Sequence, residues 1–167
     1  MTTGIPAVTA ALAAAALTVL AHPVHAQPSP ADETEVLAVV EALFDGMRAA
    51  DSSAVRSTLH PEARLVSVAD GEGGPALRAE AMDGFIAAVG SPHEETWDER
   101  IWEPEVRIDG RLATVWVPYA FYLGATFSHC GIDAFQLYRS EDGWQIFQIA
   151  DTRRREGCEI PEDVSGR

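Results

Sequence analysis

Residues 127–155 read FSHCGIDAFQLYRSEDGWQIFQIADTRRR, and this stretch decides the fold. Two runs, 127–139 and 144–151, alternate apolar and polar residues with a period of two, which is typical of β-strands. Residues 140–143 read SEDG, a turn signal that predicts an antiparallel hairpin between the two runs. Asp133 precedes Phe135 by two residues, so we expect its carboxyl on the same face as the apolar core.

The residues before this hairpin predict helices first and strands later. Apolar residues recur at helical spacing over 31–50, and shorter helices are expected over 51–59 and 76–89. Asp32 is the expected N-cap of the first helix, with Glu35 as its capping-box partner. Strands are predicted at 65–68, 97–108 and 112–123, and a loop at 70–75. This order predicts an α+β fold, with helices on one face of a bent sheet.

The charge of the chain excludes some partners. Its 167 residues suit one domain, and 26 acids against 12 arginines give a net charge of −14. Such a surface repels nucleic acid and anionic lipid, so we expect neither as a partner.

The first 26 residues contain no charged side chain, and residues 7–21 form an unbroken run of Ala, Leu, Val and Thr. This run has the length of a signal-peptide hydrophobic region, and Val24 and Ala26 supply the small residues of a cleavage site. We therefore predict a signal peptide at 1–26, a linker at 27–31, one domain at 32–155 and an irregular tail at 156–167. The mature protein is expected in the periplasm or secreted; an uncleaved anchor or a misplaced start is the alternative.

The chain has two cysteines, Cys130 and Cys158. In an oxidising compartment, two cysteines in a small chain suggest one disulfide. The spacing leaves a second interpretation open, in which one thiol is buried and free and the other is exposed.

Four segments in this order resemble the nuclear transport factor 2-like superfamily: MRAAD at 47–51, LHPEA at 59–63, GIDAFQL at 131–137 and DGWQI at 142–146. The superfamily includes ketosteroid isomerases, polyketide cyclases of the SnoaL type and scytalone dehydratases. The resemblance spans residues 34–153, and two further segments look like an exported bacterial subgroup without an established function. It implies a cone in which a strongly bent antiparallel sheet and three helices enclose a pocket. It also implies a homodimer formed through the outer face of the sheet.

The resemblance carries over to one catalytic residue of the ketosteroid isomerases and fails at two others. Asp133 matches the acid that donates a proton to the developing oxyanion. The position of the general base is Ser67, and the position of the helix tyrosine is Leu43. Because a serine with no base beside it cannot remove a carbon-bound proton near neutral pH, we do not expect a ketosteroid isomerase.

Asp133 and His129 are the candidate catalytic pair, acting as acid and base. The alternative is that Asp133 is a buried group tied to nearby polar partners. The candidate ligand-binding residues are His60, Ser67, Trp97, Trp116, Tyr119, Tyr122 and Gln148; the aromatic ones could equally be core or interface residues. The run Arg153–Arg155 is expected to be a solvated tail. We expect neither a metal ion nor a cofactor, since no short ligand spacing or phosphate loop appears.

Three functions remain open. The first is an exported protein that binds a small apolar or aromatic molecule in its cone, without turnover. The second is a cofactor-independent lyase, isomerase, cyclase or dehydratase that uses Asp133 and His129. The third is a non-catalytic dimeric interaction module with a filled core.

Overall fold

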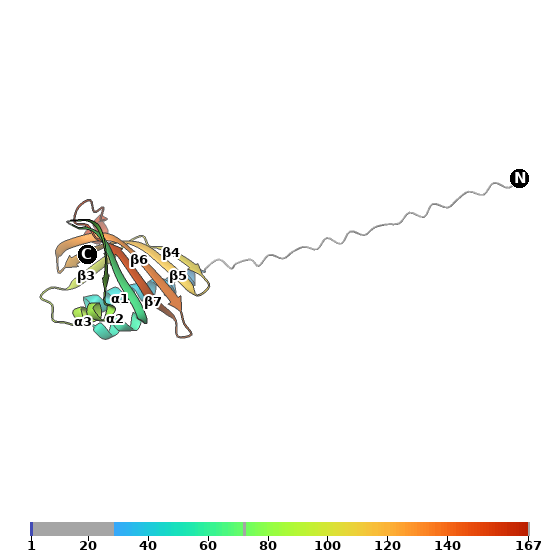
Figure 1. The fold of residues 1–167 in the computed structure, drawn as a ribbon, viewed down its shortest axis with the longest axis horizontal. Coiled ribbons are helices and arrows are strands. Elements are labelled where there is room, and N and C mark those ends of the chain that lie inside the picture. Colours follow the sequence, from blue (N-terminus) through green and yellow to red (C-terminus); the bar gives the residue numbers. More distant parts are fainter. Residues whose placement is uncertain (2–28, 72, 167) are drawn as a thin grey trace.

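The chain forms helices first and strands later, and the computed structural model describes residue 1, residues 29–71 and residues 73–166 (Figure 1). The predicted signal segment, apart from Met1, lies outside the described residues. The elements are α1 (Pro30–Arg48), α2 (Ser52–Thr58), β1 (Leu59–Gly71), β2 (Gly74–Glu80), α3 (Met82–Val89), β3 (Trp97–Ile101), β4 (Glu105–Asp109), β5 (Leu112–Leu123), β6 (Thr126–Arg139), β7 (Trp144–Thr152) and α4 (Glu162–Ser165). Within the described part of the chain, no helix is long and apolar enough to cross a membrane.

The described strands form one curved, seven-stranded sheet in the order β2-β1-β7-β6-β5-β3, with β4 also paired to β5. Strands β1 and β7 run parallel and the other pairs are antiparallel, so the sheet is mixed rather than purely antiparallel as expected. Helices α1, α2 and α3 lie together on one side of it (Figure 1). The predicted α+β architecture, with helices from the N-terminal half against a bent sheet, is confirmed.

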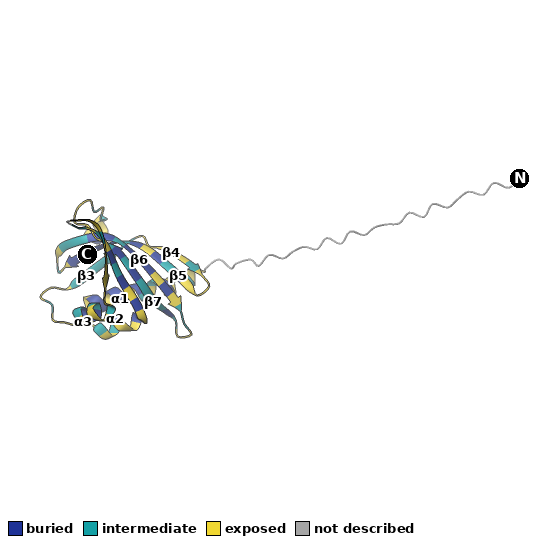
Figure 2. Cartoon of the chain, in the orientation of Figure 1, coloured by how far each residue is buried: buried dark blue, intermediate teal, exposed yellow. Residues whose placement is uncertain are grey.

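The core lies between these helices and the concave face of the sheet. Buried and more exposed residues alternate along the strands, as Figure 2 shows for β5, β6 and β7. The buried set on these strands includes Val115, Val117, Tyr119, Asp133, Phe135, Leu137, Ile146, Ile149 and Asp151. Phe135 packs edge to face against Phe44 of α1, with ring centroids 6.0 Å apart. Two carboxyls, those of Asp133 and Asp151, are therefore buried in this mainly apolar interior.

Helix α1 begins about one turn before the start that an N-cap at Asp32 would give it. Ser29 is the N-cap, Pro30 is the first helical residue, and Asp32 is the partner that completes the capping box. The predicted cap was wrong because the S/T-x-x-D/E pattern starts at Ser29 and proline is favoured at the first helical position. Asp32 and Glu35 instead form ion pairs with Arg139 of β6.

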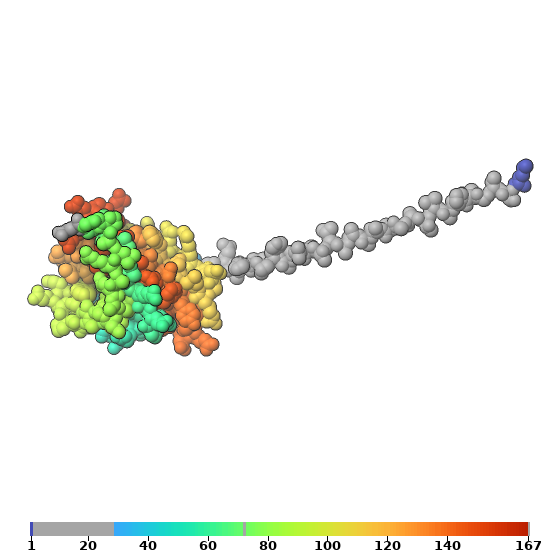
Figure 3. Space-filling model, viewed as in Figure 1, coloured from blue at the N-terminus to red at the C-terminus, as the bar shows by residue number. Residues whose placement is uncertain are grey.

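Residues 76–80 form strand β2 and not the first part of a helix. They pair with β1 in a hairpin whose turn includes Gly74 at φ +104°, a conformation that favours glycine. The sequence ALRAE has good helix formers, but the hairpin satisfies its backbone groups through β1 and leaves Leu77 exposed. Strand β1 is correspondingly longer than predicted. The hairpin forms part of the viewed face in Figure 3, where it is green.

The strand predicted at 97–108 is two strands, β3 and β4, which both pair with β5. Glu103 lies between them at φ +46°, and Pro104 has no N–H to continue the ladder. The break faces Pro118 of β5, whose carbonyl accepts a hydrogen bond from the Trp102 N–H at 3.3 Å. Two separate strands along one long partner allow the sheet to bend around the helices.

The C-terminal residues are fastened to the sheet next to the buried carboxyls. A disulfide joins Cys130 of β6 to Cys158, which confirms the predicted pair. The tail is not wholly irregular, because α4 forms within it and Arg100 donates to the carbonyls of Val164 and Ser165. At Gly131 a Cβ atom would lie 1.7 Å from the Thr152 carbonyl oxygen, so only glycine permits this approach of β6 to β7.

Candidate ligand-binding site

A cavity of about 520 Å³ lies between helices α1 and α3 and the concave face of the sheet. This volume falls within the range of roughly 300–1,000 Å³ that is usual for small-molecule sites. Its apolar wall is made by Leu43, Phe44, Met47, Leu65, Phe85, Ala88, Trp97, Phe121, Leu123, Phe135 and Ile149. Both helices contribute only uncharged side chains to the cavity, so every charged group that lines it comes from the sheet or its edge.

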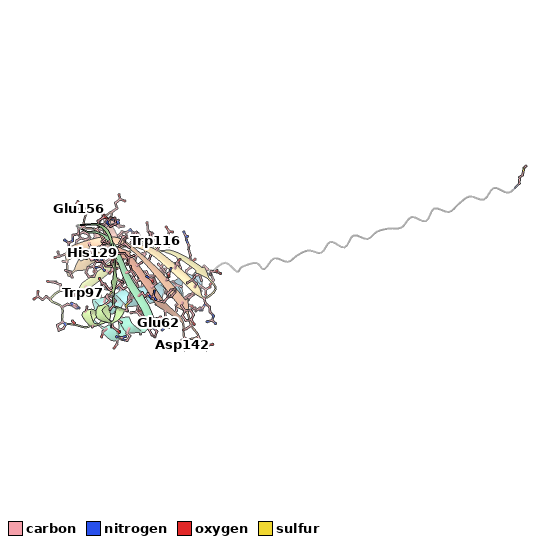
Figure 4. The ribbon with its side chains drawn as sticks, in the orientation of Figure 1. Glu62, Trp97, Trp116, His129, Asp142 and Glu156 are labelled. Carbon is pink, nitrogen blue, oxygen red and sulfur yellow. A yellow bond between two sulfur atoms is a disulfide. The ribbon has the colours of Figure 1, made fainter. Side chains whose placement is uncertain are left out.

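The polar part of the lining is made by Glu80, Glu99, Tyr119, His129, Asp133, Asp151 and Arg153. Figure 4 labels two of the lining residues, His129 on β6 and Trp97 on β3. Among the described residues, no group of three His, Cys, Asp or Glu side chains is placed to hold a metal ion.

Glu99 of β3 and Asp133 of β6 form a carboxyl pair at the cavity wall. Their side chains share a hydrogen bond, and two carboxyls can do so only when one of them holds a proton. Burial, and then the neighbouring Glu99, raise the pKa of Asp133 well above its usual value. Burial likewise raises the pKa of Glu99 to about 7, against the opposing effect of the hydrogen bond from Asp133. Burial and their mutual repulsion therefore favour one retained proton on the pair near neutral pH.

Asp151 lies next to the pair, and both of its carboxyl oxygens accept hydrogen bonds. Its Oδ1 accepts from the Ser67 hydroxyl at 2.5 Å, and its Oδ2 accepts from Arg153 Nε at 2.6 Å. The hydroxyl of Tyr119 donates to the Thr152 carbonyl at 2.9 Å and lies 3.4 Å from Asp151 Oδ2. Asp151 thus has the donors that Asp133 lacks.

His129 reaches the cavity between two aromatic rings. Its ring centroid lies 5.7 Å from that of Tyr119 and 5.1 Å from that of Phe121. Burial and then the charge of Arg153 lower the pKa of His129, so the imidazole is neutral near pH 7. Its Nδ1 lies 3.0 Å from the Ser128 hydroxyl. His129 therefore shares the cavity with Asp133, whose interacting carboxyl is that of Glu99.

The structure brings together some of the residues that the sequence proposes as a site. Asp133, His129, Trp97 and Tyr119 all line the cavity. Ser67 is buried behind the wall and holds Asp151 in place through its hydroxyl.

The remaining candidates lie away from the cavity. Trp116 and Tyr119 are three residues apart on one strand and point to opposite faces, so Trp116 is 53% exposed on the outer side of the sheet. Tyr122 is also on the other face from Tyr119, where it lies under the Arg100 guanidinium at 4.0 Å and against Phe127.

Gln148 and His60 line a shallow outer depression together with Tyr138. A register shift between β6 and β7 buries both Ile146 and Ile149, so Gln148 does not share the inward face that simple alternation from Ile146 would give it. The ring of His60 packs against Tyr138, with centroids 6.3 Å apart, and its Nδ1 accepts from the Glu62 N–H.

Residues 31–149 match the family described as "Putative lumazine-binding". The chain belongs to this family. A comparison with curated proteins finds no match.

Solved structures similar to this lumazine-binding-like chain show the same fold at low sequence identity. A protein of unknown function with a cystatin-like fold from Nostoc punctiforme has a TM-score of 0.62 at 10% identity, covering 78% of this chain and 96% of its own. An NTF2-like protein of unknown function from Shewanella baltica has a TM-score of 0.61 at 16% identity, covering 77% and 99%. An NTF2-like protein from Novosphingobium aromaticivorans has a TM-score of 0.60 at 12% identity, covering 80% and 88%. The predicted nuclear transport factor 2-like fold is thereby confirmed.

Three polar cavity residues, Glu80, Glu99 and Arg153, were not predicted as site residues, and the sequence contains a signal for one of them. Glu99 alternates with Trp97 and Ile101, so it is an acid on an apolar strand face, the same signal that singles out Asp133. Arg153 is not part of a wholly solvated tail, because its Nε binds the buried Asp151. The sequence contains no signal that Glu80 lines the cavity, because its position depends on the β1–β2 hairpin and residues 76–80 were predicted to be helical.

Proposed function

We propose that this protein is an exported small-molecule-binding protein whose ligand occupies the cavity between the helices and the sheet. The observation that carries the proposal is the cavity itself, which has a long apolar wall and a polar end with named hydrogen-bonding groups. Sites for small molecules combine these two features, because the apolar wall supplies affinity and the few polar groups fix orientation. An interaction module with a filled core would have no such space.

The wall favours an aromatic or apolar ligand. Trp97 and Phe121 lie edge to face with ring centroids 6.1 Å apart, and Phe85 from α3 lines the same space. Flat rings pack well against such aromatic side chains. The family description names lumazine, a fused bicyclic heteroaromatic compound, and we include it among the probes.

Two substitutions on α3 provide a matched test. Ala88 lines the cavity and Ala87 is exposed on the same helix, so Ala88→Phe fills the cavity and Ala87→Phe does not. Binding of the neutral fluorescent probe N-phenyl-1-naphthylamine, and of lumazine, is measured by fluorescence and thermal shift. We expect the wild type and Ala87→Phe to bind at least one probe, and Ala88→Phe to lose about ten-fold or more in affinity. Equal binding by all three proteins, or by none, contradicts the proposal.

Export is supported by the disulfide, because disulfides persist mainly in oxidising compartments. We propose that residues 1–26 are a signal peptide and that the mature chain is periplasmic or secreted. Amino-terminal sequencing of the protein from a periplasmic fraction should start near residue 27. A cytoplasmic protein that keeps its first 26 residues contradicts this part of the proposal.

The carboxyl pair supports a second candidate function, a cofactor-independent lyase, isomerase, cyclase or dehydratase. A carboxylate that titrates near neutral pH beside a protonated acid provides both a base and an acid. In this scheme Glu99 replaces His129 as the partner of Asp133. Exchange of C–H hydrogens of aromatic ketones in D₂O, followed by NMR, should then be catalysed by the wild type and lost in Glu99→Gln. An equal rate in both proteins removes this candidate.

We also propose a homodimer that forms through the outer face of the sheet. Trp116, Leu112 and Tyr138 expose large apolar surfaces, and exposed aromatic residues are enriched at protein interfaces. Their strands β5 and β6 are adjacent in the sheet.

A further inference from the structure

The polar end of the cavity carries more negative than positive groups. Glu80 comes from β2, Glu99 from β3, Asp133 from β6 and Asp151 from β7, whereas Arg153, which follows β7, is the one guanidinium among the described lining residues. His129 adds no charge at neutral pH. The net field at this end therefore favours a cation over an anion.

Arg153 does not neutralise the carboxyl pair, because it is committed to Asp151. The Nε–Oδ2 distance of 2.6 Å is that of a charge-assisted hydrogen bond, and the Ser67 hydroxyl completes the shell of Asp151. Arg48 of α1 is also engaged elsewhere, since its Nη1 donates to the Glu99 backbone carbonyl and to Asp98, and its Nη2 to Asp45. Both cations near the pair thus have closer partners than the Glu99 carboxyl.

The carboxyl pair of Glu99 and Asp133 lacks both a further hydrogen-bond donor and a neighbouring positive charge of its own. Asp133 is 3% exposed and lines the cavity, and apart from its contact with Glu99 its Oδ2 atom has no hydrogen-bond partner among the described residues. Once Glu99 ionises, the pair has one proton and one negative charge at the edge of an apolar space. A partly buried charge without a cation, and a carboxyl pair without a donor from the rest of the protein, are each unfavourable, and a ligand that carries N–H donors and a positive charge relieves both.

The walls determine what kind of cation fits. Trp97, Phe121 and Tyr119 present aromatic rings next to the acids, and ring faces attract organic cations. A bare metal ion would leave the apolar wall uncovered, whereas an aromatic body would cover it. We propose, as an extension of the binding function above, that the cavity selects an arylalkyl amine or aryl amidine cation whose charged nitrogen binds Glu99 and Asp133. The ring system of the ligand lies against Trp97 and Phe121.

Three probes of matched shape test the charge preference: 2-naphthylmethylamine as the cation, 2-naphthalenemethanol as the neutral analogue and 2-naphthoate as the anion. Their affinities for the mature protein are measured by calorimetry near pH 8, where Glu99 is ionised. Sodium chloride at about 0.3 M screens the general attraction of an acidic surface for cations. We expect the amine to bind about ten-fold or more tightly than the alcohol, and the naphthoate to bind weakest.

Two variants separate the pair from the overall charge. Glu99→Gln should reduce the ratio of amine to alcohol affinity to about three-fold or less. Glu94→Gln, at an exposed acid between α3 and β3, should keep the wild-type ratio. In the wild type the ratio should also fall as the pH drops through about 7, because Glu99 becomes protonated while the amine stays charged.

The outcomes distinguish this inference from the function on which it rests. If the alcohol binds and the amine has no advantage, or if the advantage survives in Glu99→Gln, the cation selectivity is wrong and the binding function stands. If none of the three probes nor N-phenyl-1-naphthylamine binds, both proposals fail together.

Discussion

Replacing Glu99 by glutamine should stabilise this protein at alkaline pH. The substitution keeps the size of the side chain and its ability to hydrogen bond to Asp133, and it removes a carboxyl whose ionisation the fold opposes. Burial raises the pKa of Glu99 from 4.5 to about 7, so the folded chain holds a proton there that the unfolded chain releases. Wild-type stability therefore decreases as the pH rises from 4.5 to about 7, and the decrease is complete above the folded pKa.

The size of the effect follows from the two pKa values. At about 1.4 kcal/mol for each pH unit, the raised pKa of Glu99 lowers the free energy of unfolding by about 3 kcal/mol above pH 8 and by about 1 kcal/mol at pH 5, relative to a chain in which Glu99 stays protonated. The stability advantage of Glu99→Gln over the wild type should thus grow by about 2–3 kcal/mol between pH 5 and pH 8. For a domain of this size, this corresponds to a rise of roughly 5–10 °C in the difference between the two melting temperatures.

Urea unfolding of both proteins at pH 5, 6, 7 and 8 measures the advantage directly. Glu94→Gln, which changes an exposed acid, is the control and should follow the wild type at every pH. An advantage that is the same at pH 5 and pH 8 would refute the reasoning, because it would mean that Glu99 is ionised without difficulty in the folded state. The carboxyl pair, and the charge selectivity built on it, would then lose their physical basis.

Three further predictions concern the framework around the cavity. Cys158→Ser opens a disulfide that spans 28 residues and should lower the free energy of unfolding by about 3–4 kcal/mol, measured in urea without reductant; an unchanged midpoint would contradict it. Gly131→Ala places a methyl group 1.7 Å from a backbone oxygen and should cost about 3 kcal/mol or more, whereas Gly73→Ala meets nothing within 4 Å and should be neutral. If the homodimer uses the outer face, light scattering should show a wild-type dimer that Trp116→Arg converts to a monomer and Leu77→Arg does not; a monomeric wild type removes the proposal.

The architecture could be predicted because its signals are local and repeated. Strands β5, β6 and β7 show period-two alternation, and turn residues stand at Asp109-Gly110 and at 140–143. The hairpin of β1 and β2 could not be predicted, because residues 76–80 favour a helix by propensity and become a strand only by pairing. The split between β3 and β4 falls at Glu103 and Pro104: the proline is a signal of a break that the sequence shows, whereas a strand pattern does not reveal the left-handed conformation of Glu103.

The candidate site could be predicted where inward and outward side chains alternate along a strand without a register shift. Asp133 shares the inward face with Phe135 and Leu137, as its spacing from them requires. Gln148 was misplaced because a register shift next to it is invisible in the sequence. Glu99 followed the same pattern as Asp133, yet its importance comes from contact with a residue 34 positions away, and such a pairing appears only once the strands are assembled.

The most direct test of the central claim is a crystal structure of the mature protein with 2-naphthylmethylamine bound. We predict that the amine nitrogen lies about 3 Å from a carboxyl oxygen of Glu99 or Asp133, with the naphthalene ring against Trp97 and Phe121. An amine bound on the outer face near Trp116, with side chains filling the space between the helices and the sheet, would contradict the account.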